Sequence, residues 1–326
     1  MIITLTANPS LDRTVSLPSA LERGEVQRAV AVRQESGGKG VNVSRALVTS
    51  GVDTLAVLPG AETDPVLAGL SEANVPFAAL PIAEPLRTNV ALTEPDGTTT
   101  KINEPGPVLD AAQQEALIAL LLERAEGASW VVLAGSLPPG FPADFYTTVT
   151  RRLRQLTSGA PLIAVDSSGG PLAAAVVGDA AGTPDLLKPN AEELAELAEA
   201  AGFGHPYTAE QLEADPEAAA RAAAAVVGSG VATVLATLGS KGAVLVTADG
   251  AWLATHPPVT AVSTVGAGDS SLAGYLLAHG LGKSPADCLR QAVAHGAAAA
   301  SLPGSTVPAV SQTTPDAVTI TALRKD

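Results

Sequence analysis

Short apolar runs recur along the chain, and turn-forming residues bound most of them. Runs of this length and content are typical of buried strands in a parallel sheet. The predicted strands are Ile2–Ala7, Thr54–Leu58, Phe77–Leu80, Trp130–Ala134, Leu162–Val165, Asp185–Leu187 and Val231–Ala236, followed by a hairpin of Ala243–Val246 and Ala251–Thr255.

Between these runs, apolar residues recur at the spacing of an amphipathic helix. Strands that alternate with helices in this way predict an α/β fold, with a mostly parallel central sheet and helices on both faces. The predicted helices are Val41–Ser50, Pro65–Ala73, Asp110–Glu126, Ala143–Leu156, Leu172–Val177, Glu192–Ala200, Ala209–Val227, Ala267–His279, Pro285–Ser301 and one near Thr314–Leu323.

One part of the chain departs from this alternation. Asn89–Thr93 and Thr98–Ile102 alternate polar and apolar residues around the turn Glu94–Gly97, which predicts a β-hairpin. Residues 11–35 have a similar β-like polarity and no strong helical pattern. We therefore expect strands from about 11–35 and 86–104 to form a small β-sheet lid, set apart from the main sheet.

Composition narrows the class of protein. The chain has 326 residues, 46% of them hydrophobic, and a formal net charge of −14. We treat residues 1–326 as one domain, since a single α/β domain can reach this size. The negative charge argues against non-specific binding to nucleic acid or to anionic membranes. No secretory signal or apolar run of membrane-spanning length is evident, so we expect a cytoplasmic protein.

Cysteine and histidine carry little chemistry in this sequence. The single cysteine, Cys288, excludes an intrachain disulfide and any cysteine-based zinc site. The four histidines, at positions 205, 256, 279 and 295, have no metal-ligand spacing. A structural or surface role is therefore expected for each of them.

The stretch from Ser263 to Ser271 is a glycine-rich turn that runs into an apolar helical pattern. Glycines at 266 and 268 let a ligand approach the backbone, and the helix N-terminus favours an anion such as phosphate. Asp269, in the first helical turn, is placed to accept a proton from a hydroxyl. The stretch lacks the third glycine of a dinucleotide fingerprint and the Gly-Lys-Ser/Thr of a P-loop. Plain helix capping remains the alternative.

A second glycine-rich turn, Gly37–Asn42, also opens a predicted helix. Lys39 offers a point positive charge there, and Asn42 offers a donor and an acceptor together. Arg87 and Lys101 lie on the predicted lid. Cations on the lid of an acidic protein suggest an anion beneath it, with a solvated face as the alternative.

Polar residues follow several predicted strands, where an α/β sheet binds its ligands. Asp12, Ser136, Lys188–Asn190 and Gly239–Gly242 all stand at such ends, which predicts one shared cleft. Asn190 and Glu193 have the spacing of a capping box, and a role near phosphate and magnesium is the alternative.

With these residues in place, the chain resembles the ribokinase-like sugar kinase family, also called the phosphofructokinase-B family. The resemblance covers nearly the whole length. It rests on two family signatures and on four segments of the phosphosugar branch, namely Gly37–Leu47 and Ser263–Gly274, then Asn8–Arg13, Thr98–Gly106, Gly135–Pro138 and Lys188–Asn190. The resemblance implies a three-layer sandwich that binds ATP and Mg²⁺.

The resemblance also implies site residues. Asp269 would be the catalytic base, with Gly266, Ala267 and Gly268 as the anion hole. The sugar would contact Asp12, Gly37, Gly38 and Asn42, and its phosphate would contact Lys39, Arg87, Lys101 and Ser136. ATP would contact Lys188, Asn190, Thr237, Gly239, Ser240, Lys241, Gly242, Val293 and Ala297.

For metal ions, the resemblance maps indirect magnesium binding to Asn190 and Glu193. It maps a monovalent-cation loop, for K⁺, to Ser263, Val265, Ala299, Leu302 and Gly304. The family often has Asp where this chain has Ser263, so one carboxylate ligand for that ion is missing.

The reaction that the resemblance favours is ATP-dependent phosphorylation of D-fructose 1-phosphate to fructose 1,6-bisphosphate, by in-line transfer. Tagatose 6-phosphate, fructose 6-phosphate or a nucleoside are alternative acceptors, and a non-catalytic sugar-phosphate sensor is an alternative of another class. Val90 and Leu92 on one side of a lid strand suggest a homodimer through the lid.

Overall fold

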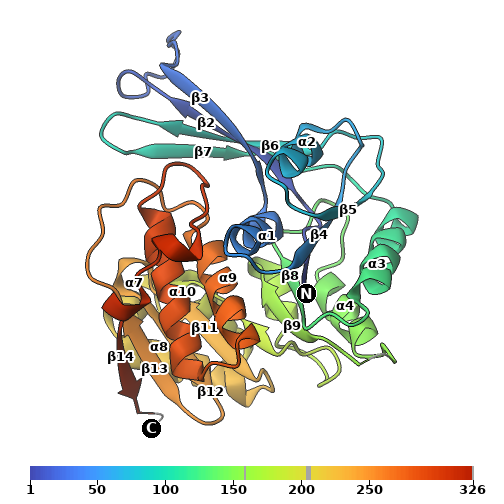
Figure 1. Cartoon of the computed structure of the whole chain (residues 1–326), viewed down its shortest axis with the longest axis vertical. Coiled ribbons are helices and arrows are strands. Elements are labelled where there is room, and N and C mark those ends of the chain that lie inside the picture. The colour runs from blue at the N-terminus through green and yellow to red at the C-terminus, as the bar shows by residue number, and fades with distance from the viewer. Residues whose placement is uncertain (158, 203–206, 325–326) are drawn as a thin grey trace.

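The computed structural model describes residues 1–157, 159–202 and 207–324, and its strands form two sheets (Figure 1). The large sheet has ten strands in the order β14-β13-β12-β11-β10-β9-β8-β1-β4-β5. These strands are β1 (Ile2–Leu5), β4 (Thr54–Pro59), β5 (Phe77–Leu80), β8 (Trp130–Ala134), β9 (Leu162–Asp166), β10 (Leu186–Leu187), β11 (Thr233–Thr237), β12 (Ala243–Thr247), β13 (Ala251–Thr255) and β14 (Thr319–Leu323).

Seven neighbouring strands of this sheet run parallel, namely β11, β10, β9, β8, β1, β4 and β5. Strands β12, β13 and β14 extend the sheet with antiparallel pairing. The α-helices are α1 (Lys39–Thr49), α2 (Pro65–Glu72), α3 (Ala111–Ala125), α4 (Phe145–Leu153), α5 (Gly169–Ala174), α6 (Ala191–Ala200), α7 (Ala209–Ala214), α8 (Pro216–Gly228), α9 (Ala267–Gly280) and α10 (Pro285–Ala300). The predicted α/β class is confirmed.

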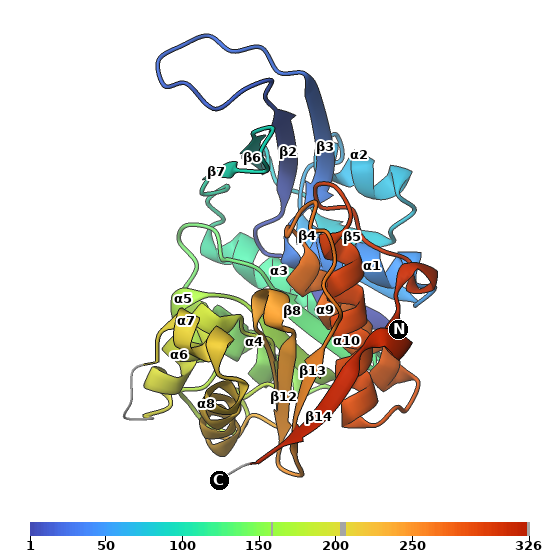
Figure 2. The ribbon, with the colours of Figure 1, turned by 90° about the vertical axis from the view of Figure 1, so that its left-hand side faces the viewer.

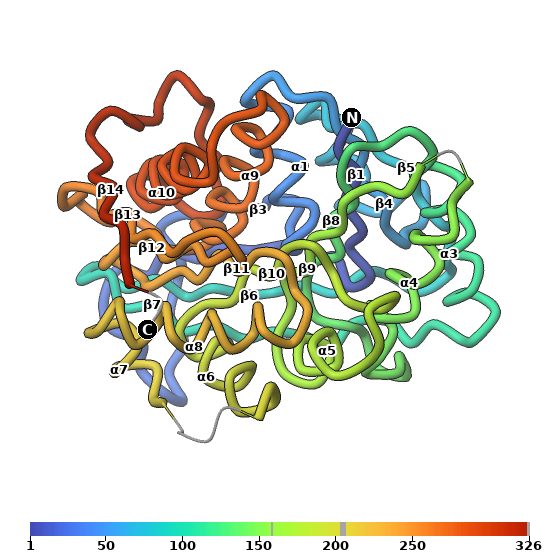
Figure 3. Tube along the Cα trace, turned by 90° about the horizontal axis from the view of Figure 1, so that it is seen from below, coloured from blue at the N-terminus to red at the C-terminus, as the bar shows by residue number. Residues whose placement is uncertain are grey.

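Helices cover both faces of the large sheet, as the view along it shows (Figure 3). Successive side chains of a strand point to opposite faces. Ile2 therefore belongs to a core cluster with residues of α1, α9 and α10, whereas Ile3 belongs to the cluster on the other face, with residues of helices α3 to α8. A third cluster joins α2 to β4 near the lid. The result is the three-layer sandwich expected from the resemblance.

The predicted lid is a separate four-stranded sheet in the order β3-β2-β6-β7. Its strands stand beyond the helical layers at one end of the molecule (Figure 2). They are β2 (Ser10–Ser16), β3 (Ala31–Gly37), β6 (Arg87–Thr93) and β7 (Thr99–Asn103). Strands β2 and β6 pair in parallel, so two segments far apart in sequence join at the centre of the lid.

The helix predicted near Thr314–Leu323 is wrong. That segment holds a short 3₁₀ turn, Pro315–Ala317, and then strand β14, which pairs antiparallel with β13. Its sequence, Thr-Ile-Thr-Ala-Leu, has β-branched residues that suit a strand, and β13 leaves an edge for it to pair with.

The single helix predicted over Ala209–Val227 is also wrong, because the chain breaks at Asp215. Asp215 Oδ1 accepts hydrogen bonds from the N–H groups of Glu217 and Ala218, and Pro216 occupies the first position of α8. Proline fits a helix start because that position needs no N–H donor. No helix in the described ranges is both long enough and apolar enough to cross a membrane.

Candidate functional site

The two glycine-rich turns meet where helices α1 and α9 begin. Gly38 and Gly266 precede these helices with φ of 104° and 76°, a region that side chains disfavour. The Asn42 Nδ2 group on α1 donates a hydrogen bond of 2.9 Å to Asp269 Oδ2 on α9. The structure therefore brings together two motifs whose contacting residues are 227 positions apart in the sequence.

Asp269 has the electrostatics of a general base. Its side chain is 7% exposed. Burial, and then the nearby charge of Asp166, raise its pKa to about 6, while Lys39, Lys188 and Asn42 oppose that shift. A carboxylate with this pKa is ionised at neutral pH and is still basic enough to take a proton.

Near Asp269 lies a cluster of charges centred on the fully buried Asp166, the last residue of β9. Asp166 Oδ1 is 2.6 Å from Lys39 Nζ, and Oδ2 is 3.0 Å from Lys188 Nζ. Burial alone would raise the pKa of Asp166, but Lys188 and then Lys39 outweigh it and hold that pKa below its usual value. Burial also favours the neutral form of Lys39, yet Asp166 and Glu193 raise its pKa.

Sequence analysis gave Asp166 no role. The available signal was its position, because it ends an apolar strand as the other candidate residues do. Lys39 turns toward Asp166 and Glu193, so it links the predicted sugar motif at the start of α1 to the predicted nucleotide motif at the start of α6.

Asn190 and Glu193 form the predicted capping box of α6. The Glu193 N–H donates to Asn190 Oδ1 and the Asn190 N–H donates to Glu193 Oε2, both at 2.8 Å. Glu193 Oε1 faces Lys39 Nζ at 3.5 Å. Among the described residues no three acidic, His or Cys side chains form a metal cluster. A lone carboxylate suits Mg²⁺ that keeps its waters and is held by nucleotide phosphates, so the residues fit indirect binding.

The predicted sugar residue Asp12 lies on lid strand β2 and is held by two neighbours. The hydroxyl of Ser10 donates to its Oδ1 at 2.7 Å, and Asn89 Nδ2 donates to the same oxygen at 3.0 Å. Burial raises the pKa of Asp12, although Ser10, Asn89 and the Arg87 guanidinium oppose that shift. A Cβ atom at Gly37 would overlap the Asp12 carboxylate, so a side chain at this position would displace Asp12.

Arg87 and Ser136 reach the same end of the site. Arg87 Nη1 donates to the Glu104 carbonyl at 3.2 Å, and its buried Nε has no partner among the described residues. Asn8 Nδ2 is 3.4 Å from Ser136 Oγ. Asn8 contacts Ser136, and Asn89 donates to Asp12. Neither asparagine was given a role from the sequence. Lys101 is exposed on β7.

The predicted nucleotide residues gather beyond β10 and β11. The Thr237 N–H donates to the Pro189 carbonyl at 2.9 Å, which joins the Lys188–Asn190 segment to the end of β11. Gly239–Lys241 follows as a 3₁₀ turn, and Gly242 closes it. Ala297 is half-buried on α10, whereas Val293 is buried against the core.

The segments proposed for a monovalent cation lie side by side. The N–H groups of Val262 and Ser263 both donate to the Ala300 carbonyl, at 2.8 and 3.2 Å. Val265 N–H donates to Ser263 Oγ at 3.2 Å. The Leu302 N–H donates to the Ala299 carbonyl at 3.0 Å, and Gly304 has a φ of 62°.

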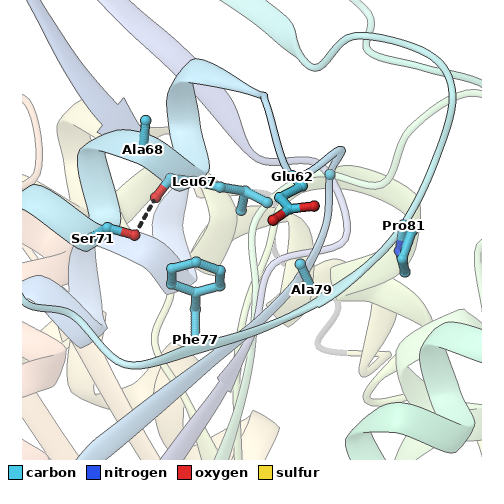
Figure 4. A pocket seen from close by; sticks show the side chains of 8 residues that line it. Glu62, Leu67, Ala68, Ser71, Phe77, Ala79 and Pro81 are labelled. Atoms are coloured by element: carbon cyan, nitrogen blue, oxygen red, sulfur yellow. Dashed lines mark hydrogen bonds between the residues drawn. The ribbon is translucent and has the colours of Figure 1, made fainter.

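A cavity of about 450 Å³ lies elsewhere, between α2 and the edge strand β5 (Figure 4). It contains none of the predicted site residues. Its lining is Gly60, Glu62, Leu67, Ala68, Ser71, Phe77, Ala79 and Pro81. The charged groups around Asp269 and Asp12, not this cavity, mark the candidate site.

Comparison with known proteins gives consistent matches over most of the chain. A family model described as "pfkB family carbohydrate kinase" matches residues 6–312. The ATP-dependent 6-phosphofructokinase isozyme 2 of Mycobacterium tuberculosis is 37% identical over 309 residues, 93% of this chain and 85% of that protein. The 1-phosphofructokinase of Rhodobacter capsulatus is also 37% identical, over 298 residues, 90% of this chain and 88% of that protein.

The fold matches a solved structure equally well. The crystal structure of phosphofructokinase-2 from Escherichia coli, in complex with substrates and products, has a TM-score of 0.84 and 31% identity. The match covers 95% of this chain and 96% of that one.

Proposed function

The chain belongs to the pfkB family of carbohydrate kinases and is an ATP-dependent sugar phosphate kinase, and on that premise we propose that it phosphorylates D-fructose 1-phosphate. The product would be fructose 1,6-bisphosphate. The observation that carries the proposal is the buried Asp269 carboxylate at the start of α9, which accepts a hydrogen bond from Asn42 and lies near Asp166 with its two lysine partners, Lys39 and Lys188.

The proposed step is an in-line displacement. The Asp269 carboxylate takes the proton of the sugar hydroxyl, whose oxygen bonds to the γ-phosphorus of ATP. The bond from that phosphorus to the bridging oxygen breaks, and ADP leaves. The first turn of α9, at Gly266, Ala267 and Gly268, would present backbone N–H groups and the positive end of the helix dipole to the developing charge.

At the nucleotide end, Lys188 and Asn190 would contact the phosphates, and Glu193 would hold Mg²⁺ through water. Mg²⁺ neutralises phosphate charge during transfer. The turn Gly239–Gly242 offers backbone donors beside them. Lys39, which pairs with Asp166 and Glu193, would lie between the two substrates and neutralise charge on either one.

At the sugar end, Asp12 would accept hydrogen bonds from sugar hydroxyls. Arg87, with its free Nε, and Ser136 would hold the substrate's phosphate. Lys101 joins that set only if the lid moves it inward, because it is exposed here. Asn8 and Asn89 would keep Ser136 and Asp12 in place.

Fructose 6-phosphate is the second candidate acceptor, because a relative named as a 6-phosphofructokinase is as similar as one named as a 1-phosphofructokinase. Initial rates with ATP and Mg²⁺ should be measured for fructose 1-phosphate, fructose 6-phosphate and tagatose 6-phosphate. We expect the highest kcat/KM for fructose 1-phosphate. A higher kcat/KM for another of these would replace the proposed acceptor, and no ADP with any of them would favour a sensor.

We also propose a homodimer through the lid. Cross-strand neighbours share a face of a sheet. The register places Val32, Val15 and Leu92 on one row, and Val90 and Ile102 on the next, on the face that does not carry Asp12 and Asn89. An apolar face of this kind is suited to binding the same face of a second copy of the chain.

We also propose that the rate of the kinase reaction depends only weakly on K⁺. The two segments of the proposed loop lie together, but Ser263 supplies a hydroxyl where a carboxylate would bind K⁺ more strongly. Rates in potassium and sodium chloride at equal ionic strength would test this. The cytoplasmic location stays a prediction from the sequence.

A further inference from the structure

Arg45 connects three parts of the molecule through one guanidinium group. It lies on α1 with its side chain 13% exposed. The two hydrogens of its Nη1 are shared among three acceptors, the Ser36 carbonyl at 3.2 Å, the Ser305 carbonyl at 3.2 Å and Asn42 Oδ1 at 3.3 Å. Its Nη2 pairs with Glu35 Oε1 at 3.2 Å.

The contact with Asn42 sets the orientation of that amide. A guanidinium can only donate hydrogen bonds, and an ionised carboxylate can only accept them. Asn42 therefore turns its oxygen to Arg45 and its NH₂ group to Asp269. If the amide turned over, its oxygen would face the Asp269 carboxylate and its NH₂ group would face Arg45.

This orientation matters for the proposed base. Because Asn42 donates to Oδ2 of Asp269, the other oxygen, Oδ1, is left for the substrate hydroxyl. The Asn42 hydrogen bond also lowers the pKa of Asp269 against the effect of burial. The other charged groups that face Asp269 are Asp166, Lys39 and Lys188. Among the described residues, Arg45 forms its hydrogen bonds and ion pair with Ser36, Asn42, Ser305 and Glu35, and with none of these three.

Glu35 extends the chain of contacts to the lid. It lies on lid strand β3, opposite Asp12 of β2 in the strand register. Its Oε2 accepts hydrogen bonds from the N–H and the hydroxyl of Ser305, at 3.1 and 3.0 Å. Arg45 and Glu35 thus tie a lid strand and the loop at 305 to the amide that contacts the base.

We propose that Arg45 is a positioning residue for the catalytic carboxylate, acting through Asn42, with Glu35 of the lid sheet holding the Arg45 guanidinium in place. This inference rests on the proposed kinase function. It assigns a role to a residue that makes no direct contact with Asp269.

The test is the pH dependence of kcat at saturating sugar phosphate and Mg-ATP, for Arg45→Met, Asn42→Ala and the double variant. We expect Arg45→Met to lower kcat roughly tenfold, the size expected for a hydrogen bond to a charged group. We expect its acid limb to move to higher pH, since Asp269 loses a donor. The double variant should show no shift beyond that of Asn42→Ala, because both act on one hydrogen bond.

Two controls keep the test decisive. Arg124→Met removes an exposed arginine of α3 and should leave the profile unchanged. Arg45→Lys keeps the charge and most of the aliphatic side chain but lacks the planar guanidinium with its several N–H donors. The acid limb of this variant should therefore also move to higher pH. It replaces Arg45→Met if that variant does not fold.

An acid limb that stays in place in the Arg45 variants, or shifts that add in the double variant, would overturn the inference. A wild-type protein that makes no ADP with any sugar phosphate would instead reject the proposed function. The two failures are therefore distinguishable.

Discussion

Asp269 combines a function with a cost in stability. We expect Asp269→Asn to lower kcat by about 10²–10⁴-fold, the usual contribution of a general base. Because the folded protein raises the pKa of Asp269 to about 6, its charge at pH 7 disfavours the folded state, and Asn should raise the melting temperature. Steady-state kinetics and thermal unfolding measure both effects. Near-normal turnover would reject the role.

The same pKa predicts the pH dependence of the wild-type enzyme. The base acts in its ionised form, so kcat/KM, which reports the pKa values of the free enzyme, should rise with pH up to about 6 and level off above it, at the pKa of Asp269. Below that pH, log kcat/KM should fall by about one for each pH unit. A profile without an acid limb near pH 6 would argue against Asp269 as the group that titrates.

Asp166 is expected to matter chiefly for stability and for the charge balance of the site. Asp166→Asn would leave Lys188, whose side chain is 4% exposed, without its counter-ion, which should lower the free energy of unfolding by about 3–5 kcal/mol. The exposed pair Arg152–Glu115 gives a matched control, because Glu115→Gln should cost at most about 1 kcal/mol.

Urea unfolding at several pH values would check the prediction for Asp166. The pKa of Asp166 is lowered in the folded state, so its stabilisation is present above the unfolded pKa, near 3.8, and is lost as pH falls below it. An Asp166→Asn protein as stable as wild type at pH 7 would contradict this account.

At the scale of elements, Gly37 ends lid strand β3 just before α1 and lies directly against Asp12 of lid strand β2. A Cβ atom there would overlap the Asp12 carboxylate, so Gly37→Ala should displace Asp12. We expect KM for the sugar phosphate to rise roughly tenfold or more, while KM for ATP changes little, since a charged hydrogen bond is worth a few kcal/mol. Gly228→Ala, where a Cβ meets nothing within 4 Å, is the control.

Two strands of the large sheet show which secondary structure a local sequence pattern can predict and which depends on a neighbouring strand. The strand Phe77–Leu80 was predicted at its observed bounds because its apolar run is short and isolated. The segment Thr319–Leu323 became a strand, against prediction, because the edge of β13 offers it backbone partners. No local signal reports the existence of such an edge.

At the scale of the whole molecule, the lid is expected to join two copies of the chain. Analytical ultracentrifugation of the wild type should give a dimer, and Val32→Asp with Ile102→Asp should give a monomer, because both residues lie exposed on the apolar lid face. Val177→Asp, at an exposed apolar residue off the lid, should stay dimeric. A monomeric wild type, or a dimeric double variant, would contradict the proposal.

Sequence alone determined the class of fold, the lid, and the two glycine-rich turns with Lys39, Asn42 and Asp269, because hydrophobic period and turn chemistry are local properties of the chain. The tertiary structure alone decided how the charges pair. Asp166 meets Lys39 and Lys188, Asn42 meets Asp269, and Arg45 meets Ser305, through contacts between separate segments of the chain. A single sequence contains no local signal for such contacts, because they arise only when the fold brings these segments together, as at the strand ends of a parallel sheet.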